Sequence, residues 1–248
     1  MNPLKTPLQW LLVLATITLG YFSFSRDFGG TIIAFLAIFS LGLIYHIFVD
    51  RVISGLFVLV ISFFILSEAF SALAYYQVLP GSMPIFMSYL LSMAGCVLIF
   101  RKIILEARIR LTFGRNSWII ILVIAANTFI AYLMIQLMSQ LELSLKHLFL
   151  GFGQTLLKLF LLSLGLVSYA LAGRRSKRLN LLYWTIGCFF LGETIDIINY
   201  TLYSDQLVLA YIFLRNGLLV IGVFAFYLFC RGAEERGELS HTKDFLKV

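Results

Sequence analysis

The segment Leu191–Tyr200, LGETIDIINY, places two carboxylic acids and an amide in a stretch of otherwise apolar residues. Because an α-helix turns by about 100° per residue, Glu193, Asp196 and Asn199 fall within an arc of roughly 120° on one helical face. Two carboxyl groups one turn apart repel each other when both are ionised, so one of them is expected to keep its proton. A protonated acid beside a carboxylate is suited to general acid–base chemistry and to carrying protons.

Three more ionisable residues interrupt apolar segments, namely Glu68, Lys158 and Arg215. A charged side chain at the centre of a bilayer costs about 2.5–3.5 kcal/mol, so such groups are expected to face the protein interior and to pair. The sequence therefore predicts a polar site with acid–base candidates and with groups that bind the substrate. The acids are Glu68, Asp196 and Glu193, and the binding candidates are Lys158, Arg215, Tyr75, Asn127, Asn199 and Tyr200.

The elements that position these residues are predicted to be membrane-spanning helices. Of 248 residues, 61% are hydrophobic and only 12% are charged, where soluble domains carry about 25% charged residues. A spanning helix needs about 20 apolar residues, so residues 1–230 are predicted to form one all-α transmembrane domain, a bundle of eight helices, and 231–248 a cytoplasmic tail. The expected spans are Trp10–Phe24, Thr31–Val49, Val52–Leu79, Ile85–Phe100, Trp118–Met138, His147–Ala172, Leu179–Tyr203 and Gln206–Cys230, and the charged segment after Phe100 is a candidate extension of the fourth.

The net charge of +7 follows from the loops and does not indicate a nucleic-acid partner. With both termini in the cytoplasm, fifteen basic residues lie inside and only Arg26 and Lys146 outside, as the positive-inside rule requires. The sequence thus predicts a multi-pass protein of the cell membrane whose partners are membrane lipids. The three histidines share no helical face and the three cysteines have no metal-site spacing, so neither a metal ion nor another cofactor is expected.

Two segments resemble the YhhN-type lysoplasmalogenase family of eight-span membrane hydrolases. They are ILSEAFSAL, Ile65–Leu73, and GCFFLGETIDIIN, Gly187–Asn199, which stand where that family places intramembrane aspartates. The chain has Glu68 in place of the first aspartate, and Met87–Phe100 lacks the histidine of the family pattern. The resemblance implies that the chain cleaves the vinyl-ether bond of a lysolipid, with one acid protonating the enol ether and a carboxylate activating water.

Three functions are compatible with this pattern. The first is a hydrolase acting on a lysolipid, in which Lys158 or Arg215 holds the anionic headgroup. The second is a proton-coupled transporter that uses the same acids as carriers. The third is a structural or sensory membrane protein whose ion pairs hold the helices together, a common role of polar residues in membranes.

Reporter fusions test the predicted topology. A reporter joined at Gly81 or Asp205 is expected to report the outer side of the membrane, because each position follows an odd-numbered span. A cytoplasmic signal at either position would contradict the eight-span arrangement.

Overall fold

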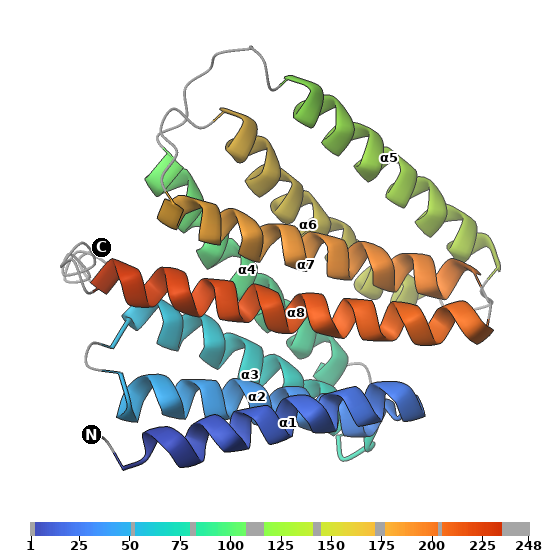
Figure 1. Cartoon of the computed structure of the whole chain (residues 1–248). Coiled ribbons are helices and arrows are strands. Elements are labelled where there is room, and N and C mark those ends of the chain that lie inside the picture. Colours follow the sequence, from blue (N-terminus) through green and yellow to red (C-terminus); the bar gives the residue numbers. More distant parts are fainter. Residues whose placement is uncertain are drawn as a thin grey trace. The chain divides into compact units, whose positions relative to one another are not determined.

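The computed structural model describes residues 3–50, 53–79, 83–107, 117–140, 145–171, 177–202 and 205–234. Over these residues it contains eight helices and no strand (Figure 1), which confirms the all-α fold class. The helices are α1 (Lys5–Ser25), α2 (Phe28–Phe48), α3 (Gly55–Tyr75), α4 (Met83–Ala107), α5 (Ser117–Gln140), α6 (Leu145–Leu171), α7 (Lys177–Leu202) and α8 (Asp205–Glu234).

The third helix is shorter at both ends than the predicted span Val52–Leu79. It begins after Ser54, whose hydroxyl oxygen accepts a hydrogen bond from the Phe57 N–H at 3.4 Å, a typical N-cap. It ends at Tyr75, and two residues later Gln77 has a φ of 54°. A residue in this left-handed conformation terminates a helix, so the local cap ends α3 before the first proline of LPGSMP.

The fourth helix continues beyond the predicted end at Phe100 and reaches Ala107. In this extension Lys102 and Glu106, one turn apart, form an ion pair of 2.8 Å. The candidate extension of the fourth span is therefore confirmed as far as Ala107. The last helix likewise continues to Glu234, so the first four residues of the predicted tail are helical.

The described helices have the length and the surface of membrane-spanning segments. Five of them are long and apolar enough to cross a bilayer, and α5, α6 and α7 contain shorter apolar stretches of 10–17 residues. Helix α1 exposes Trp10 at 69%, Ile17 at 64% and Phe24 at 64%. Exposed apolar surface of this extent needs a lipid environment or a partner, and the chain is thus a membrane protein.

Contacts within the chain define two compact units. The amino-terminal unit comprises Met1–Gly95 and Phe226–Val248, and the central unit comprises Cys96–Ala225. The prediction of one transmembrane domain over residues 1–230 stays a prediction.

In the amino-terminal unit α1, α2 and α3 lie side by side (Figure 1). The turn between α1 and α2 is capped by Asp27, whose carboxylate accepts a hydrogen bond from the Gly30 N–H at 2.9 Å. A Cβ atom on Gly29 would come within 2.6 Å of the Tyr75 ring, so the glycine lets this ring lie against the start of α2. Further along, the rings of Phe39 on α2 and Phe64 on α3 lie 5.9 Å apart, so these two helices pack through aromatic side chains.

A buried polar network joins the end of α2 to the start of α3 and to α8. The fully buried His46 donates from Nδ1 to the Asp50 carboxylate at 2.7 Å and accepts at Nε2 from the Ser54 N–H at 2.8 Å. Because Nε2 accepts a backbone N–H, it carries no proton, and the network fixes the Nδ1–H tautomer. The Tyr227 hydroxyl also lies 3.0 and 2.9 Å from the two Asp50 oxygens and donates to that carboxylate.

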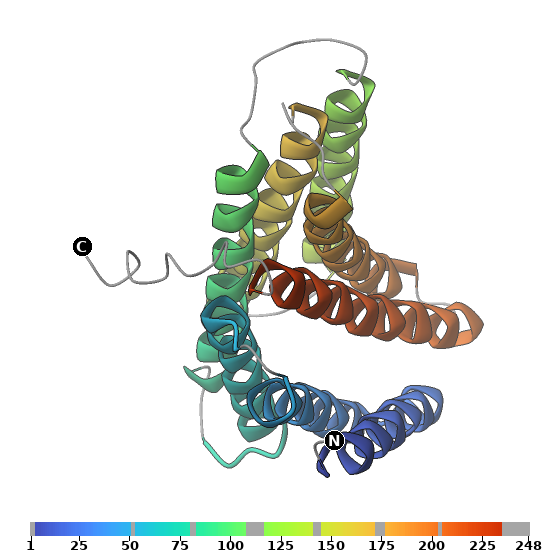
Figure 2. The same cartoon turned by 60° about the vertical axis from the view of Figure 1, so that its left-hand side comes forward.

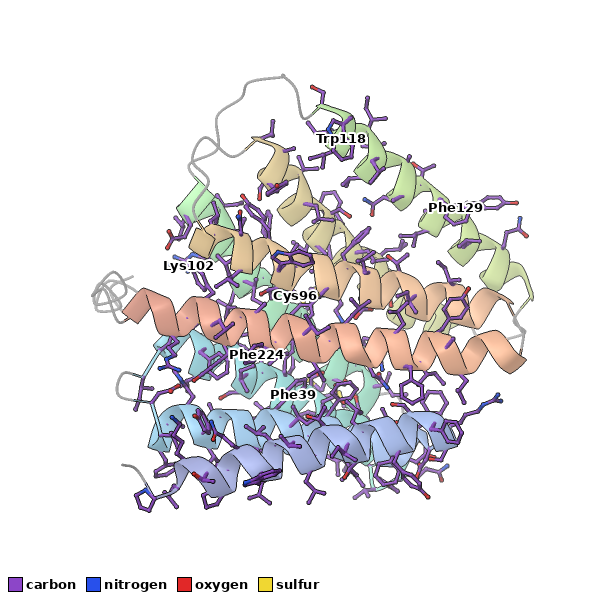
Figure 3. The ribbon with its side chains drawn as sticks, in the orientation of Figure 1. Phe39, Cys96, Lys102, Trp118, Phe129 and Phe224 are labelled. Atoms are coloured by element: carbon purple, nitrogen blue, oxygen red, sulfur yellow. The ribbon has the colours of Figure 1, made fainter. Side chains whose placement is uncertain are left out.

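In the central unit α5 and α6 lie side by side and both contact α7 (Figure 2). The rings of Tyr169 on α6 and Tyr183 on α7 meet edge to face at 4.7 Å. Phe129, 55% exposed, points away from this contact into the space outside α5 (Figure 3). The unit thus turns aromatic residues both inward, where they pack, and outward, where lipid would meet them.

The variant Tyr227→Phe removes one hydroxyl that donates to a buried carboxylate. We expect it to lower the free energy of unfolding in detergent by about 1.5–3 kcal/mol, because hydrogen bonds to charged groups are the stronger ones. Tyr45→Phe is the matched control, since the Tyr45 hydroxyl accepts only a long, exposed hydrogen bond of 3.4 Å from Gln9. Equal stabilities of the two variants would show that the network does not hold α8 in place.

Candidate functional site

The central unit contains an ion pair between two apolar helices. Lys158 on α6 donates a hydrogen bond from Nζ to Oε1 of Glu193 on α7. The two side chains are only 18% and 16% exposed. The low polarity of the surroundings strengthens their attraction, so the pair orients the Glu193 side chain toward α6.

A second cation, Arg215 on α8, belongs to the same cluster. Its charge acts on Lys158 and opposes the charge on that ammonium group, so the two cations are electrostatic neighbours. A Cβ on Gly192 would lie 3.7 Å from the Arg215 carbonyl oxygen, which brings α7 and α8 together one residue before Glu193. The Arg215 guanidinium also donates to the Asn216 side-chain oxygen at 3.1 Å. Among the described side chains, the cluster therefore contains two cations and one carboxylate.

Cys96 on α4 is a third kind of group beside this cluster. Its side chain is 1% exposed, and the charges of both Lys158 and Glu193 act on its thiol. The sequence assigned no role to this cysteine because its spacing matches no metal site or disulfide pattern. Only the packing of α4 in the central unit places the thiol near the ion pair.

For Asp196, Asn199 and Tyr200 the structure describes the backbone only. The backbone of α7 is helical through Asp196, Asn199 and Tyr200, so they share one side of the helix with Glu193, but their side chains lie outside the described residues. Glu68 belongs to the amino-terminal unit. The prediction that it shares a cavity with Glu193 and Arg215 stays a prediction.

Tyr75, another binding candidate, also belongs to the amino-terminal unit. Its ring is 51% exposed and contacts the ring of Tyr76 at 5.1 Å. Near Glu68, helix α3 contributes two serine hydroxyl groups, Ser67 and Ser71, to a cluster with Ser88 of α4. Ser71 and Ser88 lie 2.7 Å apart, and Ser67 donates to the Ser88 carbonyl oxygen at 2.8 Å. These hydroxyl groups join α3 to α4, a contact that the sequence did not predict.

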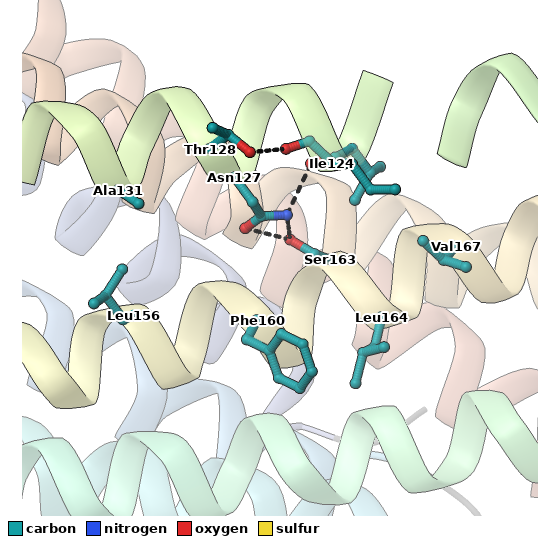
Figure 4. Close-up of a pocket in the computed structure, with 10 residues that line it drawn as sticks. Ile124, Asn127, Thr128, Ala131, Leu156, Phe160, Ser163, Leu164 and Val167 are labelled. Carbon is teal, nitrogen blue, oxygen red and sulfur yellow. Dashed lines mark hydrogen bonds between the residues drawn. The ribbon is translucent and has the colours of Figure 1, made fainter. Parts of the chain in front are cut away.

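Asn127 lies in a pocket between α5 and α6 (Figure 4). The pocket has a volume of about 460 Å³, and its lining is mostly apolar. At 100° per residue, Lys158 lies about 160° around α6 from the lining residues Leu156 and Phe160. The described part of the chain therefore separates Asn127 from the ion pair by the width of α6.

The chemistry available at the ion pair follows from its charges. A carboxylate that accepts a hydrogen bond from an ammonium group is oriented to accept a proton or to position a water molecule. Asp196, one turn further along α7, is the neighbouring candidate for the proton donor. Among the described residues no three histidine, cysteine or acidic side chains lie close enough together to hold a metal ion.

The chain matches no protein-family model, no curated protein and no solved structure. The resemblance to YhhN-type lysoplasmalogenases therefore stays a prediction carried by Ile65–Leu73 and Gly187–Asn199.

Removing one partner of the ion pair tests how much the pair contributes to the free energy of unfolding. Lys158→Met and Glu193→Leu are each expected to destabilise the protein by about 3–5 kcal/mol, because each leaves a charge without its partner in an apolar surrounding. The double variant is expected to recover most of this loss, since both charges are removed together. Chemical unfolding in detergent measures all three.

An ion pair within a single helix, α4, offers a control for these variants. Lys102→Met breaks a pair one turn apart whose side chains are 12% and 34% exposed, and such pairs within a helix contribute about 0.3–0.5 kcal/mol. A loss for Lys158→Met as small as that for Lys102→Met would contradict a tightly coupled pair.

Proposed function

We propose that this protein is a multi-pass enzyme of the cell membrane that cleaves the vinyl-ether bond of a lysolipid, with both termini in the cytoplasm. The observation that carries the proposal is the charge arrangement of the central unit. Lys158 forms an ion pair with Glu193 between α6 and α7, and Arg215 lies on α8, which meets α7 one residue before Glu193. In this proposal one of the two cations binds the phosphate of the lysolipid headgroup.

The proposed reaction needs a proton donor and a base. The donor places a proton on the vinyl carbon, and the resulting oxocarbenium ion is attacked by water. The base takes a proton from that water, and the hemiacetal then separates into a fatty aldehyde and an alcohol. Asp196 is the proposed proton donor, because the ion pair with Lys158 engages Glu193 and favours a positioning role for it. Glu68, in the amino-terminal unit, stays a separate acid–base candidate.

The same ion pair favours a second candidate function. Lys158 and Glu193 satisfy each other, and paired charges are a common means of holding membrane helices together. In this alternative the central unit is a structural or sensory membrane domain with no reaction. The two functions differ in what an amide variant does, because a structural charge affects folding and a reactive one affects turnover.

Turnover of a lysolipid with a vinyl-ether chain tests the proposal directly. The purified protein is expected to release a fatty aldehyde from this substrate and none from the matched saturated alkyl-ether lysolipid, whose bond has no double bond to protonate. Asp196→Asn and Glu68→Gln are each expected to lower kcat by about 10²-fold or more and to leave thermal unfolding in detergent nearly unchanged. Lys102→Met serves as the control for an unrelated charge change.

Two results would overturn parts of this assignment. No aldehyde release by the wild-type protein would overturn the hydrolase proposal and leave the structural alternative. Full turnover in both amide variants would show that another group donates the proton.

A further inference from the structure

The pocket between α5 and α6 contains an amide oxygen, Asn127 Oδ1, that accepts a hydrogen bond from Ser163 at 3.0 Å and has a second lone pair. Asn127 donates from Nδ2 to the Val123 carbonyl oxygen at 2.9 Å and to Ser163 Oγ at 2.6 Å. This pattern fixes the orientation of the amide, because a carbonyl oxygen turned toward Val123 would meet another acceptor. Both amide hydrogens are therefore in use, and the side-chain oxygen of Asn127 can only accept.

The Ser163 hydroxyl has a single hydrogen and two acceptors within reach. Ser163 Oγ lies 2.7 Å from the Leu159 carbonyl oxygen and 3.0 Å from Asn127 Oδ1. The shorter distance favours the helix carbonyl, as is common for serine in membrane helices. An amide oxygen has two lone pairs, so Asn127 Oδ1 can accept a hydrogen bond from a ligand whether or not Ser163 donates to it.

The volume and the mostly apolar lining of the pocket suit a largely apolar ligand. Its volume of about 460 Å³ is within the usual range for ligand pockets, roughly 300–1,000 Å³. Its lining contains no charged side chain, and its residues are Val123, Ile124, Asn127, Thr128, Ala131, Leu156, Phe160, Ser163, Leu164 and Val167. In Figure 4 the Asn127 oxygen points from α5 toward α6, on the side of Ala131 and Leu156.

The depth of Asn127 decides what kind of headgroup fits. It lies near the middle of α5, which extends from Ser117 to Gln140. A charged headgroup at such a depth would cost about 2.5–3.5 kcal/mol, and the pocket offers it no counter-charge. A single hydroxyl group needs only one hydrogen bond, and the Asn127 oxygen would accept it.

We propose that the α5–α6 pocket binds a neutral long-chain alcohol, whose hydroxyl donates to Asn127 Oδ1 and whose chain lies along Leu156, Phe160 and Leu164. The pocket opens beside helices whose outer residues are apolar, such as Ile124 at 60% exposure and Phe160 at 56%. The ligand would therefore enter from the hydrocarbon of the bilayer. This site is separate from the ion pair, since Lys158 faces away from it around α6.

A photoreactive long-chain alcohol with a diazirine in its chain tests the site in nanodiscs. Labelling is expected on peptides of α5 and α6 and is expected to be displaced by oleyl alcohol. Methyl oleate, which has the same chain and no hydrogen-bond donor, is expected to compete about five- to tenfold less well, the usual weight of one hydrogen bond. Equal competition by the alcohol and the ester would overturn the proposal, because any apolar chain would then fill the pocket.

Three variants distinguish a hydrogen bond between the ligand hydroxyl and Asn127 from apolar binding of the chain alone. Asn127→Leu keeps an apolar lining and is expected to remove the preference for the alcohol. Thr128→Val is the matched control, since the Thr128 hydroxyl donates to Ile124 within its own helix at 2.9 Å. Ser163→Ala removes the hydroxyl that competes for Asn127 Oδ1 and is expected to retain the preference. Loss of the preference in the Thr128 variant and its persistence in the Asn127 variant would place the contact elsewhere.

The probe contains no vinyl ether, so its binding does not depend on the proposed hydrolysis. Alcohol-selective labelling without aldehyde release would uphold this site and overturn the hydrolase proposal. Aldehyde release without alcohol-selective labelling would do the reverse.

Discussion

Polar atoms that enter the hydrocarbon of a membrane have to find partners within the protein, and the arrangement of this chain depends on that constraint. Each unit satisfies it by joining helices through polar side chains. Lys158 with Glu193 joins α6 to α7 in the central unit. His46 with Asp50 joins α2 to the start of α3 and to α8 in the amino-terminal unit. Apolar packing fills the space between helices, but these polar contacts set which faces meet.

The two networks differ in the groups that they contain. In the amino-terminal unit both ring nitrogens of His46 and both Asp50 oxygens have partners within the chain. This network holds helix ends together. The ion pair of the central unit shares its surroundings with the Cys96 thiol and with Arg215. Several ionisable groups gathered in an apolar setting are typical of functional sites, which makes the central unit the better candidate for chemistry.

The α5–α6 pocket adds a second kind of polar group to the central unit. Asn127 and Ser163 are uncharged, and beside their mutual hydrogen bonds the Asn127 oxygen has a second lone pair that can accept from a ligand. Because the pocket and the ion pair lie on different sides of α6, a neutral and an anionic amphiphile could be distinguished by the helix face that they meet. In these proposals the site at the ion pair selects its ligand by charge, and the α5–α6 pocket selects its ligand by a single hydrogen-bond donor.

The sequence by itself determined the all-α fold class, the approximate spans and the need of the buried charges for partners, because hydropathy and the cost of charge in lipid are properties of short segments. It did not determine the partners. The sequence favoured Arg215 as the partner of Glu193, and the structure pairs Glu193 with Lys158. His46 was considered only as a metal ligand, although Asp50 follows it at one helical turn, which is a local signal of the network. The partners of Ser54, Tyr227 and Ser163 could not be predicted. Some of these partners lie far away in the sequence, and the groups involved are backbone or hydroxyl groups that occur throughout the chain. Only the tertiary packing of the helices decided which of these groups form hydrogen bonds with each other.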